Sequence, residues 1–460
     1  MKTNKKMSPL ILGTAILSAA GILSRLVGFL YRIFLSRTIG ASALGLYQLV
    51  FPIVTLCYAI SFAGIQTAIS KYVAEGVARD SGKAGSGSSP LRYLVSGLML
   101  SVGLSLICGA LLYLASDRIA IHLLGESRCG ALLRILSYSI LPASIHSCIN
   151  GYYYGQKKTA VPAIGQLVEQ FARVGSVYLM FLITVEQGLP LTAAHAVWGI
   201  FFSEIAGLIV ATTAISISTG STCSGTKLKT GLRSGGASQS ALSTGGALAA
   251  IGSMALPLTI NQTLMHLFSS FENLLIPQRL QAYGCSTEDA LSTYGVLSGM
   301  VVSVIFFPCV LTNSLSVLLL PSVSGATARG DRKKIDRIVF LSIRYGLLFG
   351  FVFTALFLLF GSFIGAVLFD NILAGILIRK LSWLCPMMYV YSLLCSVLHG
   401  LGRPKTVLRI NLSASLIRIC IILFLVPRHG LNALLWGMLI SQLFSAIAAV
   451  IQVQNPRMQG

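Results

Sequence analysis

Long apolar segments follow one another along this chain, and they limit the folds open to it more than any other feature. They fall at about 9–37, 43–72, 91–115, 130–154, 160–185, 190–217, 247–278, 290–320, 338–360, 374–400, 405–426 and 430–452. A run of about 20 apolar residues crosses a bilayer as a helix, because lipid offers the backbone no other hydrogen-bond partners. The sequence therefore predicts an all-α polytopic membrane protein with about 12 transmembrane helices.

Composition excludes the other broad classes. The chain is 55% hydrophobic and only 10% charged, whereas a soluble domain carries about 25% charged residues. Its net charge of +21 comes from basic residues scattered between apolar segments, so we expect no nucleic-acid partner. The ten cysteines are dispersed, without CxxC or Cys/His metal spacing, which predicts interior residues and no metal site.

Basic residues also predict the orientation. Most loop Lys and Arg lie in five connections, "KYVAEGVARDSGKAGSGSSPLR", "GQKKT", "GTKLKTGLR", "ATARGDRKKIDR" and "GRPKTVLR". By the positive-inside rule these loops and both termini are cytoplasmic. The N-terminal stretch "MKTNKKMSPLILGTAILSAAG" imitates a signal peptide, but its apolar pattern continues to about Leu35. We therefore expect a first transmembrane helix that is kept in the mature protein.

The chain divides into two halves that resemble each other. A Gly/Ser-rich run predicts a cytoplasmic linker at 218–246, between six-helix lobes at 1–217 and 247–460. Three features recur at offsets of 245–247 residues: Tyr47 with Tyr294, Lys158-Thr159 with Lys405-Thr406, and Arg173 with Arg418. An even number of helices in each half makes the repeats parallel, and transporters built in this way place substrate sites between their halves.

Three arginines interrupt the first apolar segment, "GILSRLVGFLYRIFLSR". Each costs about 2.5–3.5 kcal/mol at the bilayer centre, so each needs a reason. Arg25 and Arg32 are seven residues apart and project within about 20° of each other on a helix. They face either a cavity with an anionic cargo or a structural ion pair with another helix. Arg37 is interpreted as a snorkelling anchor near the outer interface.

The segment 160–185 carries a polar stripe made by Gln166, Glu169, Gln170 and Arg173. Glu169 and Arg173 have the i, i+4 spacing of a pair that can satisfy both charges. Such a stripe avoids lipid, so it lines a helix interface or a watery cavity. Whether it is structural or functional stays open at this point.

Two more segments carry charge. Glu272 and Arg279 lie seven residues apart in 247–278 and its extension, and Arg418 lies in "RINLSASLIRIC". A guanidinium fork matches phosphate geometry and binds it more strongly where water is excluded. The predicted substrate-binding residues are Arg25, Arg32, Gln166, Glu169, Arg173, Glu272, Arg279 and Arg418, with Glu169 and Glu272 as gating or positioning partners.

Sequence motifs of enzymes and of nucleotide-driven motors are absent: there is no GxxxxGK[ST], HExxH or GxSxG. We therefore expect no enzymatic activity, cofactor or nucleotide partner. The membrane potential or a gradient of H⁺ or Na⁺ would supply the energy. His266 is interpreted as an interior histidine, with a proton-relay role as the alternative.

Several stretches carry a family resemblance: "SRLVGFLYRIFLSRTIGASALGLYQ", "NGYYYGQKKTAVPAIGQLVEQFARV", "SFENLLIPQRL" and "YGVLSGMVVSVIFFPCVLTNSLSVLLLPSVSG". Over nearly its whole length the chain resembles the polysaccharide biosynthesis (oligosaccharide flippase) family, in its stage V sporulation protein B-like branch. This family is part of the multidrug/oligosaccharidyl-lipid/polysaccharide exporter superfamily. The resemblance implies V-shaped six-helix lobes, alternating access, and undecaprenyl-pyrophosphate-linked sugars flipped to the outer leaflet. It places a monomer in the cytoplasmic membrane of a bacterium, alone or with envelope-synthesis enzymes.

Site residues carry over only where motifs match. Arg25 in "SRLVGF" matches the first-helix arginine of the lipid II flippases, and Arg32 matches their next arginine with a shift of one residue. Before "FP", this chain has Ser303 and Phe306 where those flippases have Arg and Glu. The leading hypothesis is a flippase for a lipid-linked oligosaccharide or peptidoglycan precursor. The alternatives are a cation-coupled multidrug antiporter of the same superfold and a non-transporting scaffold for envelope synthesis.

Overall fold

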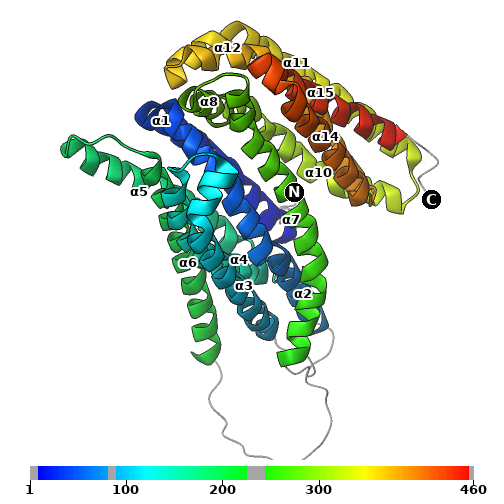
Figure 1. Cartoon of the computed structure of the whole chain (residues 1–460). Coiled ribbons are helices and arrows are strands. Elements are labelled where there is room, and N and C mark those ends of the chain that lie inside the picture. The colour runs from blue at the N-terminus through cyan, green and yellow to red at the C-terminus, as the bar shows by residue number, and fades with distance from the viewer. Residues whose placement is uncertain (1–8, 81–89, 225–243, 455–460) are drawn as a thin grey trace, which may run out of the picture. The chain divides into compact units, whose positions relative to one another are not determined.

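The structure is a computed structural model that describes residues 9–80, 90–224 and 244–454, and nearly all of these are helical (Figure 1). The first part of the chain forms α1 (Pro9–Tyr58), the π-helical turn η1 (Ala59–Ala63), α2 (Gly64–Asp80), α3 (Pro90–Arg118), η2 (Ile119–Leu124), α4 (Cys129–Gly155), α5 (Ala160–Glu186) and α6 (Ala193–Ser224). The second part forms α7 (Thr244–Ala282), α8 (Thr287–Tyr294), η3 (Gly295–Val301), α9 (Val302–Phe306), α10 (Cys309–Ala328), α11 (Arg332–Phe369), α12 (Ile372–Leu381), α13 (Leu384–Gly400), α14 (Pro404–Phe424) and α15 (Val426–Gln454).

The lengths of these helices agree with a polytopic membrane protein. Within the described residues, ten helical stretches are long and apolar enough to span a membrane, or eleven if the bent pair α12–α13 is one span. One of the ten, Ile16–Val77, has 62 residues. At about 1.5 Å per residue it is roughly twice as long as a bilayer is thick. Gly40, with φ 78° and ψ 172°, breaks its helical geometry. The predicted all-α membrane fold is confirmed, and the predicted number of 12 helices is approximate.

The chain forms two compact units. Unit 1 contains the described residues of Met1–Val27 and Val50–Leu267, and unit 2 contains Gly28–Leu49 and those of Phe268–Gly460. Helices α1 and α7 therefore each contribute to both units. Most of the predicted linker, at 225–243, lies outside the described residues. The lobe boundaries at 217 and 247 stay a prediction.

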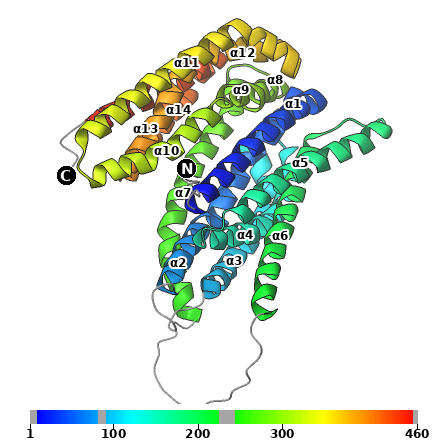
Figure 2. The same cartoon turned by 180° about the vertical axis from the view of Figure 1, so that it is seen from behind.

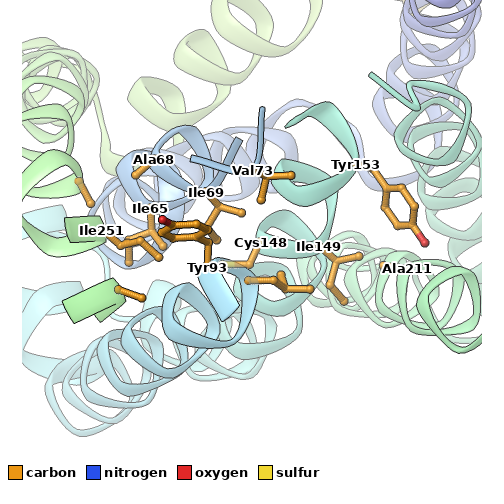
Figure 3. Packing of buried hydrophobic residues seen from close by; sticks show 13 residues of the cluster. Ile65, Ala68, Ile69, Val73, Tyr93, Cys148, Ile149, Tyr153, Ala211 and Ile251 are labelled. Carbon is orange, nitrogen blue, oxygen red and sulfur yellow. The ribbon is translucent and has the colours of Figure 1, made fainter. Parts of the chain in front are cut away.

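Unit 1 is built around α4, which packs against α2, α3 and α6, while α5 packs against α6 (Figures 1 and 2). One of its apolar clusters joins five helices, α2, α3, α4, α6 and α7. Figure 3 shows Ile65 and Ile69 of α2 beside Tyr93 of α3, with Cys148 of α4 and Ile251 of α7 close by. All five of these residues are at most 9% exposed. This cluster fixes α4, which carries a site residue described below.

Unit 2 repeats part of this arrangement. Helix α13 packs against α10, α11 and α15. Helix α14 lies beside α15, as Figure 1 shows. Its apolar core includes Val323 of α10 and Leu394, Val397 and Leu398 of α13, all of which are fully buried. The pair α14–α15 of unit 2 thus corresponds to the pair α5–α6 of unit 1.

Candidate functional site

Charged side chains of unit 1 gather where α4, α5 and α6 pack together. The Nε2 atom of His146 lies 2.7 Å from Glu204 Oε2, and its Nδ1 atom lies 3.4 Å from Glu169 Oε1. His146 and Glu204 are only 7% and 8% exposed. The hydroxyl of Tyr58 exchanges a hydrogen bond with Ser139 at 2.9 Å and donates to Glu204 at 3.5 Å. One imidazole is thus held between two carboxylates inside an apolar unit.

A glycine makes room for this arrangement. Gly207 lies on α6, one turn after Glu204. A Cβ atom added at Gly207 would lie 2.5 Å from Glu169 Oε1. Real Cβ contacts do not come this close, so any larger residue here would push the carboxylate of Glu169 aside. The absence of a side chain at Gly207 therefore allows Glu169 to approach His146.

Arg173 of the same polar stripe also bonds to another helix. Its guanidinium donates to Ser203 Oγ from Nε at 3.3 Å and from a terminal nitrogen at 3.1 Å. The sequence spacing predicts a local pair between Glu169 and Arg173. In the structure Glu169 lies against α4 and Arg173 against α6, so the stripe cross-links three helices.

Unit 2 has a simpler charged cluster. Arg418 of α14 donates to Glu272 Oε1 of α7 at 2.8 Å and to Ser441 Oγ of α15 at 3.1 Å. This bond to a serine on the neighbouring helix repeats the bond of Arg173 to Ser203. Glu272 is therefore neutralised by Arg418 from another helix.

Three of the predicted arginines lack a carboxylate partner among the described residues. Arg25 is exposed and makes no hydrogen bond or ion pair there, and Arg32 donates only to the hydroxyl of Ser303. The Nε atom of Arg279 is buried without a hydrogen-bond partner. Gln166 is exposed on α5. The structure thus leaves cationic groups within apolar helices that no acidic side chain of the described chain neutralises.

The internal repeat relates these residues to one another. Tyr47 and Tyr294 define an offset of 247 residues. By the same offset in the sequence, Glu272 is the repeat equivalent of Arg25, and Arg279 is the repeat equivalent of Arg32. The pair Arg32 and Arg279 is therefore cationic in both halves, whereas the pair Arg25 and Glu272 changes sign. The serine that Arg32 contacts, Ser303, is one of the two positions at which the sequence departs from the lipid II flippase pattern.

Arg37 has a different role from its neighbours. Its Nε atom donates to the carbonyl of Leu368 at 2.9 Å, and a terminal nitrogen donates to the carbonyl of Val367. These carbonyls belong to the last turn of α11, whose orphan acceptors a basic side chain satisfies well. Arg37 also lines a cavity of about 370 Å³ in unit 2, together with Met300, Asp370 and other residues. In addition to any anchoring role, Arg37 caps a helix.

Sequence reasoning did not single out His146 and Glu204 as site residues. Glu204 in "FFSEIAG" is an acidic residue within an apolar helix, which is itself a signal of function. The role of His146 depends on which helices α4 contacts, and no local pattern shows this. Among the described residues, no group of three His, Cys, Asp or Glu side chains could hold a metal ion.

The sequence of this chain is similar to a known protein family and to several bacterial proteins. The sequence profile of the polysaccharide biosynthesis protein family matches residues 10–283. Stage V sporulation protein B of Bacillus subtilis is 26% identical over 441 residues, which are 94% of this chain and 82% of that protein. The lipid II flippase MurJ of Bacillus subtilis is 26% identical over 214 residues, which are 44% of this chain and 38% of MurJ.

Solved structures show the same fold at low sequence identity. An inward-facing multidrug resistance MATE family transporter of the MOP superfamily has a TM-score of 0.70 at 14% identity and covers 94% of both chains. A MOP superfamily transporter from Pyrococcus furiosus, described as having a binding pocket of reversed polarity, has a TM-score of 0.58 at 14% identity, covering 97% of this chain and 93% of its own. The chain shares the fold of these structures, and because the family profile matches more than half of its length, it belongs to the polysaccharide biosynthesis protein family.

Proposed function

We propose that this protein is a flippase that moves a lipid-linked oligosaccharide or peptidoglycan precursor, joined to its lipid by pyrophosphate, across the cytoplasmic membrane by alternating access. Both termini would lie in the cytoplasm. The match to the polysaccharide biosynthesis protein family and the similarity to the lipid II flippase MurJ support this class of cargo. The sugar would cross in a hydrated path while the prenyl chain stays in lipid.

The unneutralised arginines carry this proposal. Arg25 has no partner among the described residues, Arg32 bonds only to a serine hydroxyl there, and the Nε atom of Arg279 is buried and unbonded. An unpaired cation in apolar surroundings is costly unless an anion or water reaches it. Pyrophosphate is such an anion, and guanidinium groups bind phosphate oxygens through paired, charge-assisted hydrogen bonds.

The paired charges have a secondary part in the proposal. Glu169 and Glu272 each lie against a basic side chain, His146 and Arg418. They would position those groups or release them during the transport cycle. Arg173 and Arg418, each bonded to a serine on a neighbouring helix, would then contribute to phosphate binding in their own unit.

The test is leaflet translocation of a fluorescent undecaprenyl-pyrophosphate oligosaccharide in proteoliposomes with an imposed membrane potential. The unmodified protein should flip the lipid, and Arg25→Ala should abolish flipping while the protein stays inserted and folded. The matched control is Arg134→Ala, because Arg134 is an exposed arginine of the same unit that already pairs with Asp117.

Other outcomes would point elsewhere. Flipping by Arg25→Ala at the unmodified rate would remove Arg25 from the mechanism. If the folded, inserted protein flips no lipid but expels a cationic dye, the chain is a cation-coupled antiporter. If it moves neither and the alanine substitutions only lower stability, the scaffold hypothesis stands in its place.

A further inference from the structure

We propose that His146, Glu169 and Glu204 form a proton-binding site in unit 1, through which a transmembrane proton gradient drives transport. The coupling to transport rests on the proposed function, whereas proton binding by the cluster does not. The three residues come from α4, α5 and α6, so a change in the packing of these helices would change the distances between them.

The geometry favours one mobile proton. Both ring nitrogens of His146 face carboxylate oxygens, at 2.7 Å from Glu204 and 3.4 Å from Glu169. The contact to Glu204 has hydrogen-bond geometry, whereas Nδ1 is buried without a hydrogen-bond partner. An imidazolium donates from both nitrogens, while neutral imidazole must turn a lone pair toward one of the two anions. Protonation of Nδ1 would therefore shorten the longer of the two contacts, the one to Glu169.

Charge balance leads to the same conclusion. Two ionised carboxylates and Arg173 leave this region with one excess negative charge, which a proton on the His146–glutamate cluster cancels. An uncompensated charge is strongly disfavoured where side chains are this well buried. The remaining titratable groups that face the cluster are Tyr58 from α1 and Tyr154 from α4. Both are phenols, which are neutral near physiological pH.

Unit 2 lacks these elements at the equivalent positions. Arg173 and Arg418 define an offset of 245 residues in the sequence. By this offset, Tyr391 is the repeat equivalent of His146, and Ala414 is the repeat equivalent of Glu169. Tyr391 donates to Asn411 at 2.6 Å, and the pair of Glu272 with Arg418 is already balanced. The fold therefore keeps a basic residue on the fifth helix of each repeat, and among the described residues an imidazole and two carboxylates accompany it in unit 1 alone.

A proton suits this cluster better than a metal cation. Sites for Na⁺, like those for other hard cations, are built from oxygen ligands. Here a ring nitrogen faces each carboxylate, and the cationic Arg173 lies one helical turn from Glu169. An added cation would have to displace His146 from between the two glutamates. The proton needs no such rearrangement.

Proton binding can be measured without any cargo. The full chain is labelled with ¹⁵N-histidine, placed in lipid bilayers and studied by solid-state NMR, with His146→Gln assigning the signal. We expect the His146 signal to change with pH. We expect the protonated fraction at neutral pH to fall about tenfold in Glu204→Gln, because a stabilising carboxylate is lost. Glu126→Gln, which removes a carboxylate from an ion pair outside the cluster, should leave the signal unchanged.

A second variant keeps every titratable group in place. Gly207→Ala puts a methyl group where the carboxylate of Glu169 lies, and that flexible side chain can swing away without loss of the fold. We expect this variant to alter the His146 signal in the same direction as Glu169→Gln. Gly175→Ala on α5, which has open space around it, is the matched control. A His146 signal that stays neutral, or that none of these variants moves, would overturn the proposal.

Coupling is tested in proteoliposomes at zero membrane potential, clamped with valinomycin and potassium. An imposed pH gradient should speed flipping of the fluorescent lipid by the unmodified protein, and His146→Gln and Glu204→Gln should lose this acceleration. Flipping that ignores the pH gradient, or that follows a sodium gradient, would contradict coupling while the flippase assignment stands. Absence of flipping under every gradient would contradict the flippase assignment, and the NMR titration would still decide proton binding.

Discussion

At the scale of single residues, the main requirement is that each charge in an apolar helix finds a partner. Arg418 and Glu272 satisfy it directly, with side chains that are 25% and 12% exposed and an N–O distance of 2.8 Å. Loss of one member of such a pair leaves the other charged and poorly solvated. Replacement of both residues by apolar side chains of similar volume leaves no buried charge and keeps the packing. The pair is therefore expected to show strong coupling between its two residues.

Arg418→Met should lower the free energy of unfolding by about 3–5 kcal/mol, because Glu272 is left without a counter-charge. The double variant Glu272→Leu with Arg418→Met should recover most of this loss. Unfolding of the purified protein in detergent, followed by tryptophan fluorescence, measures both effects. Glu288→Gln, at an exposed glutamate of α8, serves as the control. Equal stability of the single and double variants would show that the ion pair is not the source of the effect.

At the scale of helices, glycines set how closely the elements pack. In "GYYYG" of α4, a Cβ atom at Gly151 would lie 2.6 Å from the carbonyl oxygen of Gln66, and one at Gly155 would lie 2.6 Å from that of Ser70. Both carbonyls belong to α2, so the two backbones touch along one face. Small residues spaced by four allow such close approach in membranes, where apolar side chains gain nothing from leaving lipid.

Gly155→Ala should destabilise unit 1 by about 1–3 kcal/mol, because backbone atoms of α2 cannot move away as a flexible side chain would. Gly175→Ala, with nothing within 4 Å of the added methyl group, should be neutral or stabilising by up to about 1 kcal/mol, since alanine favours the helix. Thermal unfolding of both variants in the same detergent makes the comparison. If Gly155→Ala unfolds no earlier than Gly175→Ala, α2 and α4 are not in the tight contact described.

At the scale of the whole molecule, the orientation in the membrane follows from loop charge. The connection between α5 and α6, residues 187–192, contains no basic residue, whereas the run "RGDRKKIDR" begins in the connection between α10 and α11. Lys and Arg favour the cytoplasmic side during insertion. These two connections are therefore expected on opposite sides, with the second in the cytoplasm.

Single cysteines at the exposed positions Gln187 and Arg329, in a background without the ten native cysteines, test this orientation. A maleimide that does not cross membranes should label Gln187→Cys in intact cells and should label Arg329→Cys only after the cells are opened. Labelling of both in opened cells confirms that each thiol is reactive. The reverse pattern would place both termini outside and contradict the predicted direction of transport.

Sequence patterns predicted the helical membrane fold because hydropathy acts locally: every apolar segment must satisfy its own backbone in lipid, whatever its neighbours are. The same reasoning singled out Arg25, Arg32, Glu169, Arg173, Glu272, Arg279 and Arg418, since intramembrane charge is visible in the sequence alone. It did not determine how these charges pair. Spacing along the chain suggested Glu169 with Arg173, whereas the structure holds Glu169 against His146, 23 residues earlier in the chain on α4.

Local hydropathy and charge thus suffice to predict the class of the fold, the approximate helix positions and the residues whose charge needs an explanation. Which charges neutralise each other, and which arginines lack an acidic partner among the described residues, became known from the structure. Pairing depends on distances of a few ångströms between helices far apart in the chain, and no local pattern encodes these distances. Those distances are set by packing details such as the missing side chain at Gly207, which lets Glu169 reach His146.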